Sequence, residues 1–364
     1  MLFLQYSRMR RPMISVSMVG PDLNARGGMA TVECNILEAL DPQVVSVRFF
    51  PTYEDGFALK KLAVFFKAYR ACARSLKTAD VLHVHMASRG SFARKRVFIN
   101  RAFREGVPVV AHLHGSEFAV WYDKECNEAG RAEIRKTLDK CARVVLLSDE
   151  WMNFFIRRNI CPRDKLTVLN NAVNIPHENT TDYFNKTVLF MGRLDDRKNP
   201  GALIHAAVSV ISEHPDVRFV FAGDGEVQRY KELACDLGIS DNCTFTGWVS
   251  DKEKSALFCR ASVFCLPSRN EGMPMSVLEA MSHGLACVAT PVGGIPQIIQ
   301  HGTNGFLVPG EGIDELAEII SSLLSQPLRK IEIGKAGRET ICNRFCLDRY
   351  VSHLTDIYRE VATR

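Results

Sequence analysis

Residues 263–281, VFCLPSRNEGMPMSVLEAM, contain the change of pattern that decides the fold. The run Val263–Leu266 is short and apolar, as in a buried strand, and a helical stretch begins near Pro274. Pro267 and Gly272 mark the loop between them. A strand that passes through a short loop into a helix is the repeating unit of a parallel sheet with crossover helices.

The same alternation extends outward in both directions as two series, separated by the polar segment Asn174–Tyr183. The strands expected in the first series are Met13–Gly20, Val81–Met86, Val109–His114, Val144–Ser148 and Leu166–Leu169. Those expected in the second are Thr187–Met191, Val217–Ala222, Cys243–Thr246, Val263–Leu266, Ala286–Ala289 and Gly305–Val308. The pattern predicts an α/β protein with two Rossmann-like domains.

The chain of 364 residues is longer than a single core usually supports. We expect an N-terminal domain over residues 1–175 and a C-terminal domain over residues 184–347. The helix expected over residues 348–364 has apolar residues at helical spacing and is predicted to strap back onto the first domain. Ligands of such sheets bind at the carboxyl ends of the strands, so the cleft between the two domains is the expected site.

Composition excludes several classes of protein. Hydrophobic residues make up 46% and charged residues 24%, which is unlike disordered or fibrous chains. No apolar run approaches the roughly 18 to 20 residues that cross a bilayer, and the apolar start Met1–Leu4 is too short for a signal peptide. The 12 cysteines form no C-x-x-C pair, so no zinc knuckle or redox motif is expected. We expect a cytoplasmic protein.

Charge is unevenly distributed along the chain. Residues 1–175 hold 27 Lys and Arg against 17 Asp and Glu, a net +10, whereas the remainder carries a net −5. An anionic partner is therefore expected on the first domain. Nucleic acid is not favoured, because no recognition motif or aromatic interleaving accompanies the basic residues.

Two acidic residues flank the helix start in the opening segment. Glu271 lies in the loop and Glu279 in the helix, eight positions later. The backbone N–H groups of Gly272–Ser276 lie between them, at a helix N-terminus that favours anions. A sugar nucleotide needs this set: amides for the diphosphate and carboxylates for sugar and ribose hydroxyls. A charged helix start with an incidental loop acid remains the alternative.

The segment Val188–Pro200, VLFMGRLDDRKNP, is a strand that leads into a basic loop with Arg193, Arg197 and Lys198. Cations at the end of a strand can stabilise the charge that develops on a departing nucleoside diphosphate. A solvated basic loop is the competing interpretation. The adjacent Asp195 and Asp196 lack D-x-D spacing, so we expect no metal.

Taken together, these motifs resemble glycosyltransferase family 4. The resemblance rests on Glu271-x7-Glu279, Gly192-Arg193 with Lys198, the Gly27-Gly28 loop after the first strand, and the Gly293-Gly294-Ile295 turn. It implies the two-domain GT-B arrangement, with the domains facing each other across a cleft, and a retaining, metal-independent transferase. It also implies that Glu279 binds the donor ribose, Glu271 the donor sugar, and Arg193 with Lys198 the diphosphate. Members that resemble this chain belong to bacterial surface or extracellular polysaccharide biosynthesis.

One position departs from the family pattern. The third residue after Glu271, often glycine in the family, is Pro274, which has no N–H to donate. We therefore expect the phosphate contacts from Met275 and Ser276, with Gly272 and Met273 completing the donor loop.

The first half supplies further candidates. Gly27 and Gly28 let backbone approach a phosphate at a helix start, with a plain tight turn as the alternative. His112 and His114 point to one face of their strand by period two. The family places a histidine at this strand end beside the reacting sugar, and His114 matches because Gly115 follows it. His112 is expected to be a core histidine.

A second H-x-H pair, His83 and His85, allows a binuclear metal hydrolase, but no carboxylate or histidine late in the chain completes such a site. In the family a stretch like Met86–Lys95 lines the acceptor side. The resemblance therefore implies acceptor contacts, such as to a lipid pyrophosphate, from Arg89, Ser91, Arg94 and Lys95.

The helix expected over residues 62–77 has one apolar face and an adjoining basic face, which is typical of a helix at a membrane interface. An ordinary Rossmann helix with a solvated basic side is equally consistent. Because the whole first domain is basic, we expect loose contact with the inner face of the cell membrane.

The sequence thus predicts transfer of a hexosyl unit, with retention, from a UDP- or GDP-sugar to a hydroxyl of a glycan or lipid-linked oligosaccharide. No cofactor is expected beyond the nucleotide sugar, and no metal. The expected catalytic residues are His114, Arg193, Lys198 and Glu271. A sugar-nucleotide epimerase, a phosphorylase and a non-catalytic sugar- or polyanion-binding protein remain alternatives.

Overall fold

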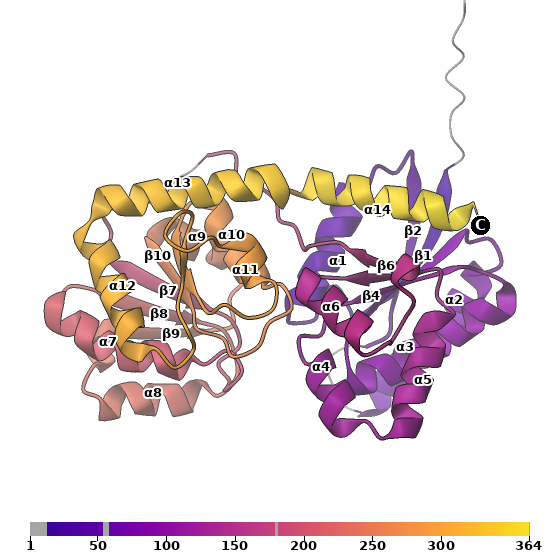
Figure 1. Cartoon of the computed structure of the whole chain (residues 1–364), viewed down its shortest axis with the longest axis horizontal. Coiled ribbons are helices and arrows are strands. Elements are labelled where there is room, and N and C mark those ends of the chain that lie inside the picture. Colours follow the sequence, from indigo (N-terminus) through magenta and orange to yellow (C-terminus); the bar gives the residue numbers. More distant parts are fainter. Residues whose placement is uncertain (1–12, 54–57, 179–180, 364) are drawn as a thin grey trace, which may run out of the picture.

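The computed structural model describes residues 13–53, 58–178 and 181–363. These residues form two lobes joined side by side (Figure 1). Within them, each lobe is built on one parallel sheet of six strands. The predicted fold class, two Rossmann-like domains, is confirmed.

The first sheet contains β1 (Ile14–Gly20), β2 (Val45–Pro51), β3 (Val81–Met86), β4 (Val109–Leu113), β5 (Arg143–Leu146) and β6 (Leu166–Val168), in the order β2-β1-β3-β4-β5-β6. The second contains β7 (Thr187–Met191), β8 (Arg218–Ala222), β9 (Cys243–Gly247), β10 (Val263–Leu266), β11 (Ala286–Ala289) and β12 (Phe306–Leu307), in the order β12-β11-β10-β7-β8-β9. In each sheet the strand order reverses beside the first strand of the series. Ligands of open α/β sheets bind at such points.

Helices connect the strands and cover both sheets (Figure 1). The first lobe has α1 (Gly28–Ala39), α2 (Ala58–Ser75), α3 (Arg89–Glu105), α4 (Phe118–Val120), α5 (Glu128–Asp139) and α6 (Asp149–Arg157), with a π-helical turn at Trp121–Glu125 and a 3₁₀ turn at Arg163–Lys165. The second has α7 (Pro200–Glu213), α8 (Val227–Asp236), α9 (Asp251–Arg260), α10 (Met275–Ser282), α11 (Ile295–Ile298), α12 (Ile313–Ser325) and α13 (Pro327–Arg344), with a 3₁₀ turn at Ser240–Asn242. The last helix is α14 (Leu347–Ala362).

The central strands match the sequence prediction closely because they are covered on both faces. Every residue of β3, β4, β10 and β11 is buried, which gives the continuous apolar run of a parallel strand. Strand β2 was not predicted. It lies at the edge of its sheet and is only partly buried, with Arg48 exposed and Pro51 at its end, so its strand signal is weak.

The C-terminal helices link the lobes. Helices α13 and α14 run along one side of the molecule, α13 over the second lobe and α14 over the first (Figure 1). The chain crosses between the lobes twice at nearly one place, since the Val173 N–H donates to the Phe345 carbonyl (3.1 Å). The apolar stripe of α14, including Tyr350, Leu354 and Tyr358, is buried. The C-terminal helix therefore straps back onto the first lobe, as predicted.

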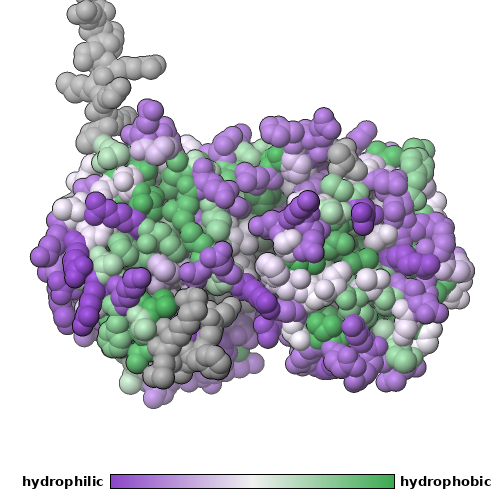
Figure 2. All heavy atoms as spheres, turned by 180° about the vertical axis from the view of Figure 1, so that it is seen from behind, coloured by the Kyte–Doolittle hydropathy of each residue, from purple (hydrophilic) through white to green (hydrophobic). Residues whose placement is uncertain are grey.

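The surface mixes hydrophilic and hydrophobic residues over both lobes (Figure 2). Within the described part of the chain, no helix is both long and apolar enough to cross a bilayer. The predicted domain limits, residues 175 and 184, fall between β6 and β7. Part of the polar segment between them, residues 179 and 180, lies outside the described residues.

Candidate active site

Loops from the two lobes meet at the carboxyl ends of the sheets. A Cβ atom added to Gly28, at the start of α1, would lie 3.6 Å from Met275 Cγ, and one added to Gly272 would lie 3.5 Å from the His114 carbonyl oxygen. The Asn171 amide also donates to the Met273 carbonyl (2.9 Å). The loop after β1, the end of β4 and the loop before α10 therefore line one place, as predicted for the cleft.

Glu271 is the centre of a buried charge cluster. Its side chain is 5% exposed; Lys198 Nζ donates to Oε1 (2.6 Å), and Arg197 Nη1 lies 3.7 Å from Oε2. A buried carboxylate is stable only when paired and hydrogen-bonded, and these two cations supply that pairing. The cluster therefore holds a cation at the edge of the cleft in a fixed position, before any ligand binds.

Local geometry explains why Lys198 reaches Glu271. The Lys198 N–H donates to Asp195 Oδ1 (2.9 Å), which closes the turn after β7, and Asn199 then adopts a left-handed conformation (φ 53°) at the start of α7. The Lys198 stem packs on Gly192, where an added Cβ would lie 3.4 Å from Cε. Asp195 thus shapes the loop that carries Lys198.

Arg193 lies apart from this cluster. Its side chain is 61% exposed and lies 3.9 Å from both Asp195 and Asp224, near Arg26 of the first lobe, which is 3.4 Å from Asp224. The structure therefore brings Arg197, and not Arg193, to Glu271. A diphosphate role for Arg193 stays a prediction that requires its side chain to turn inward.

Glu279 has its own cation. Lys254 Nζ, on α9, donates to Glu279 Oε1 (2.8 Å) and lies 3.1 Å from Asp251. Burial raises the pKa of the Glu279 carboxyl, and the Lys254 ammonium partly offsets this. The sequence analysis did not identify Lys254, since its partner is 25 positions away and no local pattern joins them. A carboxylate held beside a lysine can accept from one hydroxyl of a diol while the ammonium donates to the other.

The N-terminus of α10 is open to the cleft. Pro274 is its N-cap and provides no side-chain cap. Among the described residues, no group accepts a hydrogen bond from the Met275 or Ser276 N–H. The Gly293-Gly294 turn supports this loop, because Gly294 N–H donates to the Gly272 carbonyl (2.6 Å). Gly293 has φ +60°, and an added Cβ would overlap the Glu271 carbonyl. Only glycine fits there, which explains why that turn accompanies the Glu271 motif.

The start of α1 is a second open helix terminus. Gly27 is its N-cap with φ 132°, a conformation that side chains disfavour, and no acidic residue occupies the first turn. The positive end of the helix dipole is therefore uncompensated and lies beside Met275. Two helix N-termini, α1 and α10, face the same space and together favour a doubly charged anion such as a diphosphate.

Four histidines share one face of the first sheet. His85 Nδ1 and His114 Nε2 are hydrogen-bonded (2.8 Å), as are His83 Nε2 and His112 Nδ1 (3.3 Å). His83 Nδ1 also bonds Tyr358 Oη of α14 (2.7 Å). Burial lowers the pKa of His83 and of His114 to about 3, so these rings are neutral at pH 7. His112 is a buried core histidine, as expected.

Within the described residues, three of these histidines are close enough together to hold a metal ion. The donor atoms of His83, His85 and His112 lie within 4.8 Å of one another. Several of those nitrogens already take part in hydrogen bonds with each other, with His114 and with Tyr358. The grouping lies beneath the cleft and contains none of the residues predicted to bind the donor.

The predicted acceptor residues do not share one surface. Arg89 is exposed and pairs with Glu117 (2.6 Å) and Glu125, and the Arg94 guanidinium lies over the Tyr53 ring (5.3 Å). Ser91 Oγ accepts from the Ala87 N–H (3.1 Å), in the segment just before α3. Lys95 is 1% exposed and points into the core, where burial lowers its pKa to about 8. As it stands, Lys95 cannot contact an acceptor from the surface.

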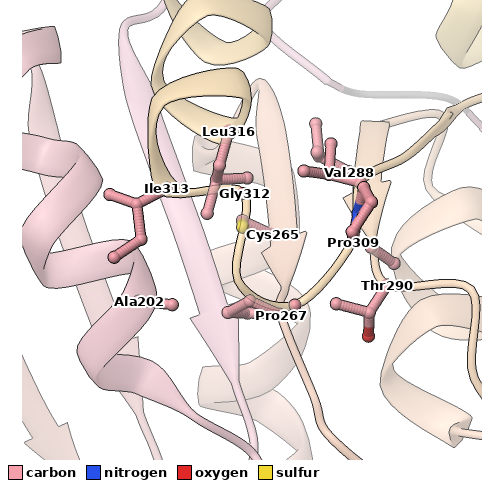
Figure 3. Close-up of a pocket in the computed structure, with 12 residues that line it drawn as sticks. Ala202, Cys265, Pro267, Val288, Thr290, Pro309, Gly312, Ile313 and Leu316 are labelled. Atoms are coloured by element: carbon pink, nitrogen blue, oxygen red, sulfur yellow. The ribbon is translucent and has the colours of Figure 1, made fainter.

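A small pocket in the second lobe is not the nucleotide site (Figure 3). Its volume is about 10 Å³, room for about one water molecule. Its lining comes from β10, β11, α7, α12 and the segment before α12, and includes Cys265, Thr290 and Leu316 but none of the predicted site residues.

Comparison with known families accounts for both lobes. Residues 21–176 match the family model described as Glycosyltransferase Family 4, and residues 175–340 match the one described as Glycosyl transferases group 1. The chain belongs to glycosyltransferase family 4. The residues that carried the resemblance lie in the two matched regions, which meet near residue 175.

Family 4 proteins similar to this chain come from several bacteria. Spore coat protein SA of Bacillus subtilis is 28% identical over 316 residues, which are 80% of this chain and 81% of that protein. The UDP-Gal:alpha-D-GlcNAc-diphosphoundecaprenol alpha-1,3-galactosyltransferase of Escherichia coli is 27% identical, over 77% of this chain and 75% of that protein. Relatives of this family 4 chain therefore include enzymes of lipid-linked sugar synthesis.

Solved structures show the same fold. HepE of Anabaena, in complex with UDP, has a TM-score of 0.75 at 18% identity and covers 96% of this chain and all of that one (100%). Sucrose-phosphate synthase of Thermosynechococcus elongatus has a TM-score of 0.76 at 18% identity, over 95% of this chain and 98% of that one. The fold is GT-B, and this family 4 protein is a glycosyltransferase of the kind that uses nucleotide sugars.

Proposed function

We propose that this glycosyltransferase moves a hexosyl unit, with retention and without a metal ion, from a UDP- or GDP-sugar to a hydroxyl of a lipid-linked glycan. The observation that carries the proposal is the Glu271 cluster, in which Lys198 is held 2.6 Å from the buried carboxylate beside two open helix N-termini. The next residue, Gly272, lies beside the His114 carbonyl oxygen, which supports a donor site with contacts on both lobes.

Each part of the site has a task in this scheme. The amides of Met275 and Ser276 and the start of α1 bind the diphosphate, while Lys198 neutralises the charge that develops as the glycosidic bond breaks. Glu279 with Lys254 binds the ribose diol. Glu271 accepts from sugar hydroxyls, and His114 contacts the sugar from the first lobe.

Retention without a nucleophile requires attack from the side of the leaving group. In this scheme the acceptor hydroxyl approaches the anomeric carbon on the same face as the diphosphate, whose oxygen takes the hydroxyl proton. The protein then supplies positioning and electrostatic stabilisation. In this scheme, Lys198 and the two helix termini supply the positive charge that a metal ion would otherwise provide.

The acceptor side is supported by charge and by one relative. The +10 balance of residues 1–175 attracts a phosphate-bearing acceptor, and the E. coli relative acts on a diphosphoundecaprenol-linked sugar. On α2, Leu62 and Phe66 are 52% and 51% exposed beside the exposed Lys67 and Arg70. That surface fits loose contact with an anionic membrane.

A donor panel tests the proposal directly. Thermal unfolding is followed in EDTA with UDP-glucose, UDP-galactose, UDP-N-acetylglucosamine and GDP-mannose, for the wild type, Glu279→Ala, and Glu318→Ala as a control on an exposed residue of the same lobe. One donor should raise the Tm of the wild type and of the control but not that of Glu279→Ala, because a ligand that binds only the native state stabilises it.

Product analysis tests the remaining parts. With the donor identified, NMR of the first product should show the anomeric configuration of the donor, and EDTA should not reduce turnover. An inverted product, or a strict need for a divalent ion, would contradict the mechanism. Donor turnover without any hydroxyl acceptor would favour the epimerase alternative.

A further inference from the structure

His85 is a fully buried histidine that touches His114 from the side away from the cleft. It lies on β3, directly opposite His112 of β4, and its ring stacks on that of His114 (centroids 5.0 Å apart, planes at 20°). Its Nδ1 is hydrogen-bonded to His114 Nε2 (2.8 Å). Its other nitrogen, Nε2, is buried without a hydrogen-bond partner.

Both rings are neutral, so each carries one N–H. Burial lowers the pKa of His114 to about 3 and that of His85 well below 6.5. The bond between them needs one N–H and one lone pair, which leaves two arrangements. Either His85 Nδ1–H donates to His114 Nε2, or His114 Nε2–H donates to His85 Nδ1.

The unpartnered nitrogen of His85 distinguishes the two arrangements. If His85 accepts, its own proton must sit on Nε2, as a buried N–H without an acceptor. If His85 donates, Nε2 carries only a lone pair. Buried N–H groups without acceptors are rarer in proteins than buried lone pairs without donors. The geometry therefore favours His85 as the donor.

The surrounding groups do not change this result. Glu33 of α1 approaches to 4.0 Å from His85 Nδ1, beyond hydrogen-bond distance, and both its oxygens lack partners. Lys95 of α3 faces the pair as a nearby amine, and His83 and His112 lie beside it. None of these four groups is hydrogen-bonded to His85 Nε2.

We propose that His85 is a positioning residue: it donates its Nδ1–H to His114 Nε2 and so holds His114 in the tautomer with the proton on Nδ1. His114 is partly exposed and lies beside Gly272 of the donor loop. It then meets the sugar as a fixed hydrogen-bond donor and not as an acceptor. This inference rests on the proposed function, in which His114 contacts the sugar.

NMR of the full chain with ¹⁵N-labelled histidine rings tests the tautomer without any substrate. The protein has ten histidines; the spectra of His114→Gln and His85→Asn identify the two signals that matter. In the wild type, His114 should be protonated at Nδ1 and unprotonated at Nε2. A wild-type His114 protonated at Nε2 overturns the proposal.

Variants at position 85 test whether His85 determines the tautomer of His114. His85→Leu removes the donor, so His114 should shift toward the Nε2–H form, whereas His85→Asn keeps an N–H donor near the place of Nδ1 and should keep the wild-type tautomer. His353→Asn, an exposed histidine on α14, is the matched control and should change neither signal. An unchanged His114 tautomer in folded His85→Leu overturns the proposal. If His85→Leu does not fold, the wild-type and His85→Asn spectra still decide.

Kinetics provide a second readout once a donor is known. His85→Leu should lower kcat at least tenfold with little change in the donor KM, a smaller loss than the roughly 10²- to 10³-fold expected when a charge-stabilising donor is itself removed. His85→Asn should restore most of the loss. Equal defects in both folded variants would indicate a merely structural role. If no donor is turned over, the proposed function fails while the NMR result stands.

Discussion

The two faces of the cleft handle buried polar groups in opposite ways. In the second lobe, Glu271 and Glu279 stay next to lysines, at 2.6 Å and 2.8 Å. In the first lobe, the histidine layer is neutral, and Glu33 and Lys95 are buried without an ion pair between them within 4.0 Å. Charge is therefore concentrated where the diphosphate is expected. The four histidines of the first lobe form a neutral network of hydrogen bonds.

This difference has a physical reason. A leaving diphosphate is stabilised by preorganised positive charge, which acts strongly where water is excluded. A sugar hydroxyl needs directional donors and acceptors, and a neutral imidazole provides one of each without a desolvated charge. Breaking the charged side should reduce turnover more than breaking the neutral side, and the neutral side should also show itself in the pH dependence of stability.

The largest expected effect comes from the charged side. Lys198→Ala should lower kcat by about 10² to 10³, because it removes a fixed cation from the developing charge and leaves Glu271 with only the more distant Arg197. Steady-state kinetics with the identified donor measure it, with Lys231→Ala, an exposed lysine of the same lobe, as control. Near-normal turnover would show that Lys198 has no such role.

The neutral side should show itself in the pH dependence of stability. Burial raises the pKa of Glu33 to about 9 from 4.5, with Lys95 opposing. Between these values the native state keeps a proton that the unfolded chain has lost, so this residue lowers stability as pH rises. Glu33→Gln removes that dependence. Relative to the wild type, it should gain up to about 1.4 kcal/mol for each pH unit between pH 6 and pH 8.

Urea unfolding at those two pH values measures the Glu33 effect. Glu38→Gln, an exposed position on the same helix, should give the same difference from the wild type at both. If Glu33→Gln also shows a constant difference, Glu33 is ionised in the native state, and the first lobe holds a buried carboxylate.

A smaller effect is expected from the ribose pair. Glu279→Gln should raise the donor KM about tenfold to a hundredfold, since a hydrogen bond to a charged group contributes about 1.5 to 3 kcal/mol. The kcat value should change little. A double-mutant cycle with Lys254→Met should show that the two effects are not additive, because the side chains are in contact. A pure kcat defect would contradict a ribose role.

The smallest effect concerns the outside of the first lobe, where its positive charge lies. Arg70→Gln, on the exposed side of α2, should weaken binding to vesicles of anionic lipid by up to about 1 kcal/mol, roughly fivefold. Co-sedimentation at low and high salt measures it, with neutral vesicles as control. Equal binding to neutral and anionic vesicles would remove the electrostatic part of the membrane proposal.

Sequence patterns predicted the strands and the loop between β10 and α10 well, because both depend on local order. The predicted limits of β3, β7, β10 and β11 are confirmed. Glu271, Gly272, Met273 and Met275 lie together because one strand, one turn and one helix start follow each other within a few residues. Edge strand β2 was missed for the converse reason, since half-exposed strands lack a continuous apolar signal.

Side-chain partners could not be predicted in the same way. The sequence analysis assigned the diphosphate to Arg193 and Lys198, but the turn at Asp195 and Asn199 directs Arg197 and Lys198 toward Glu271. The family resemblance implied an acceptor contact from Lys95, yet the packing of α3 on the sheet turns it inward. Such outcomes depend on how elements pack, which no window of neighbouring residues contains.

By itself, then, the sequence determined a two-domain α/β fold with a strand, a loop and the start of α10 around Glu271, because hydrophobic period, glycine turns and helix starts are encoded within a few residues. Only the tertiary structure decided which cation pairs with which carboxylate and which histidines are neutral. Those properties arise from contacts between residues such as Lys254 and Glu279, or His85 and His114, and from burial that only the complete fold creates.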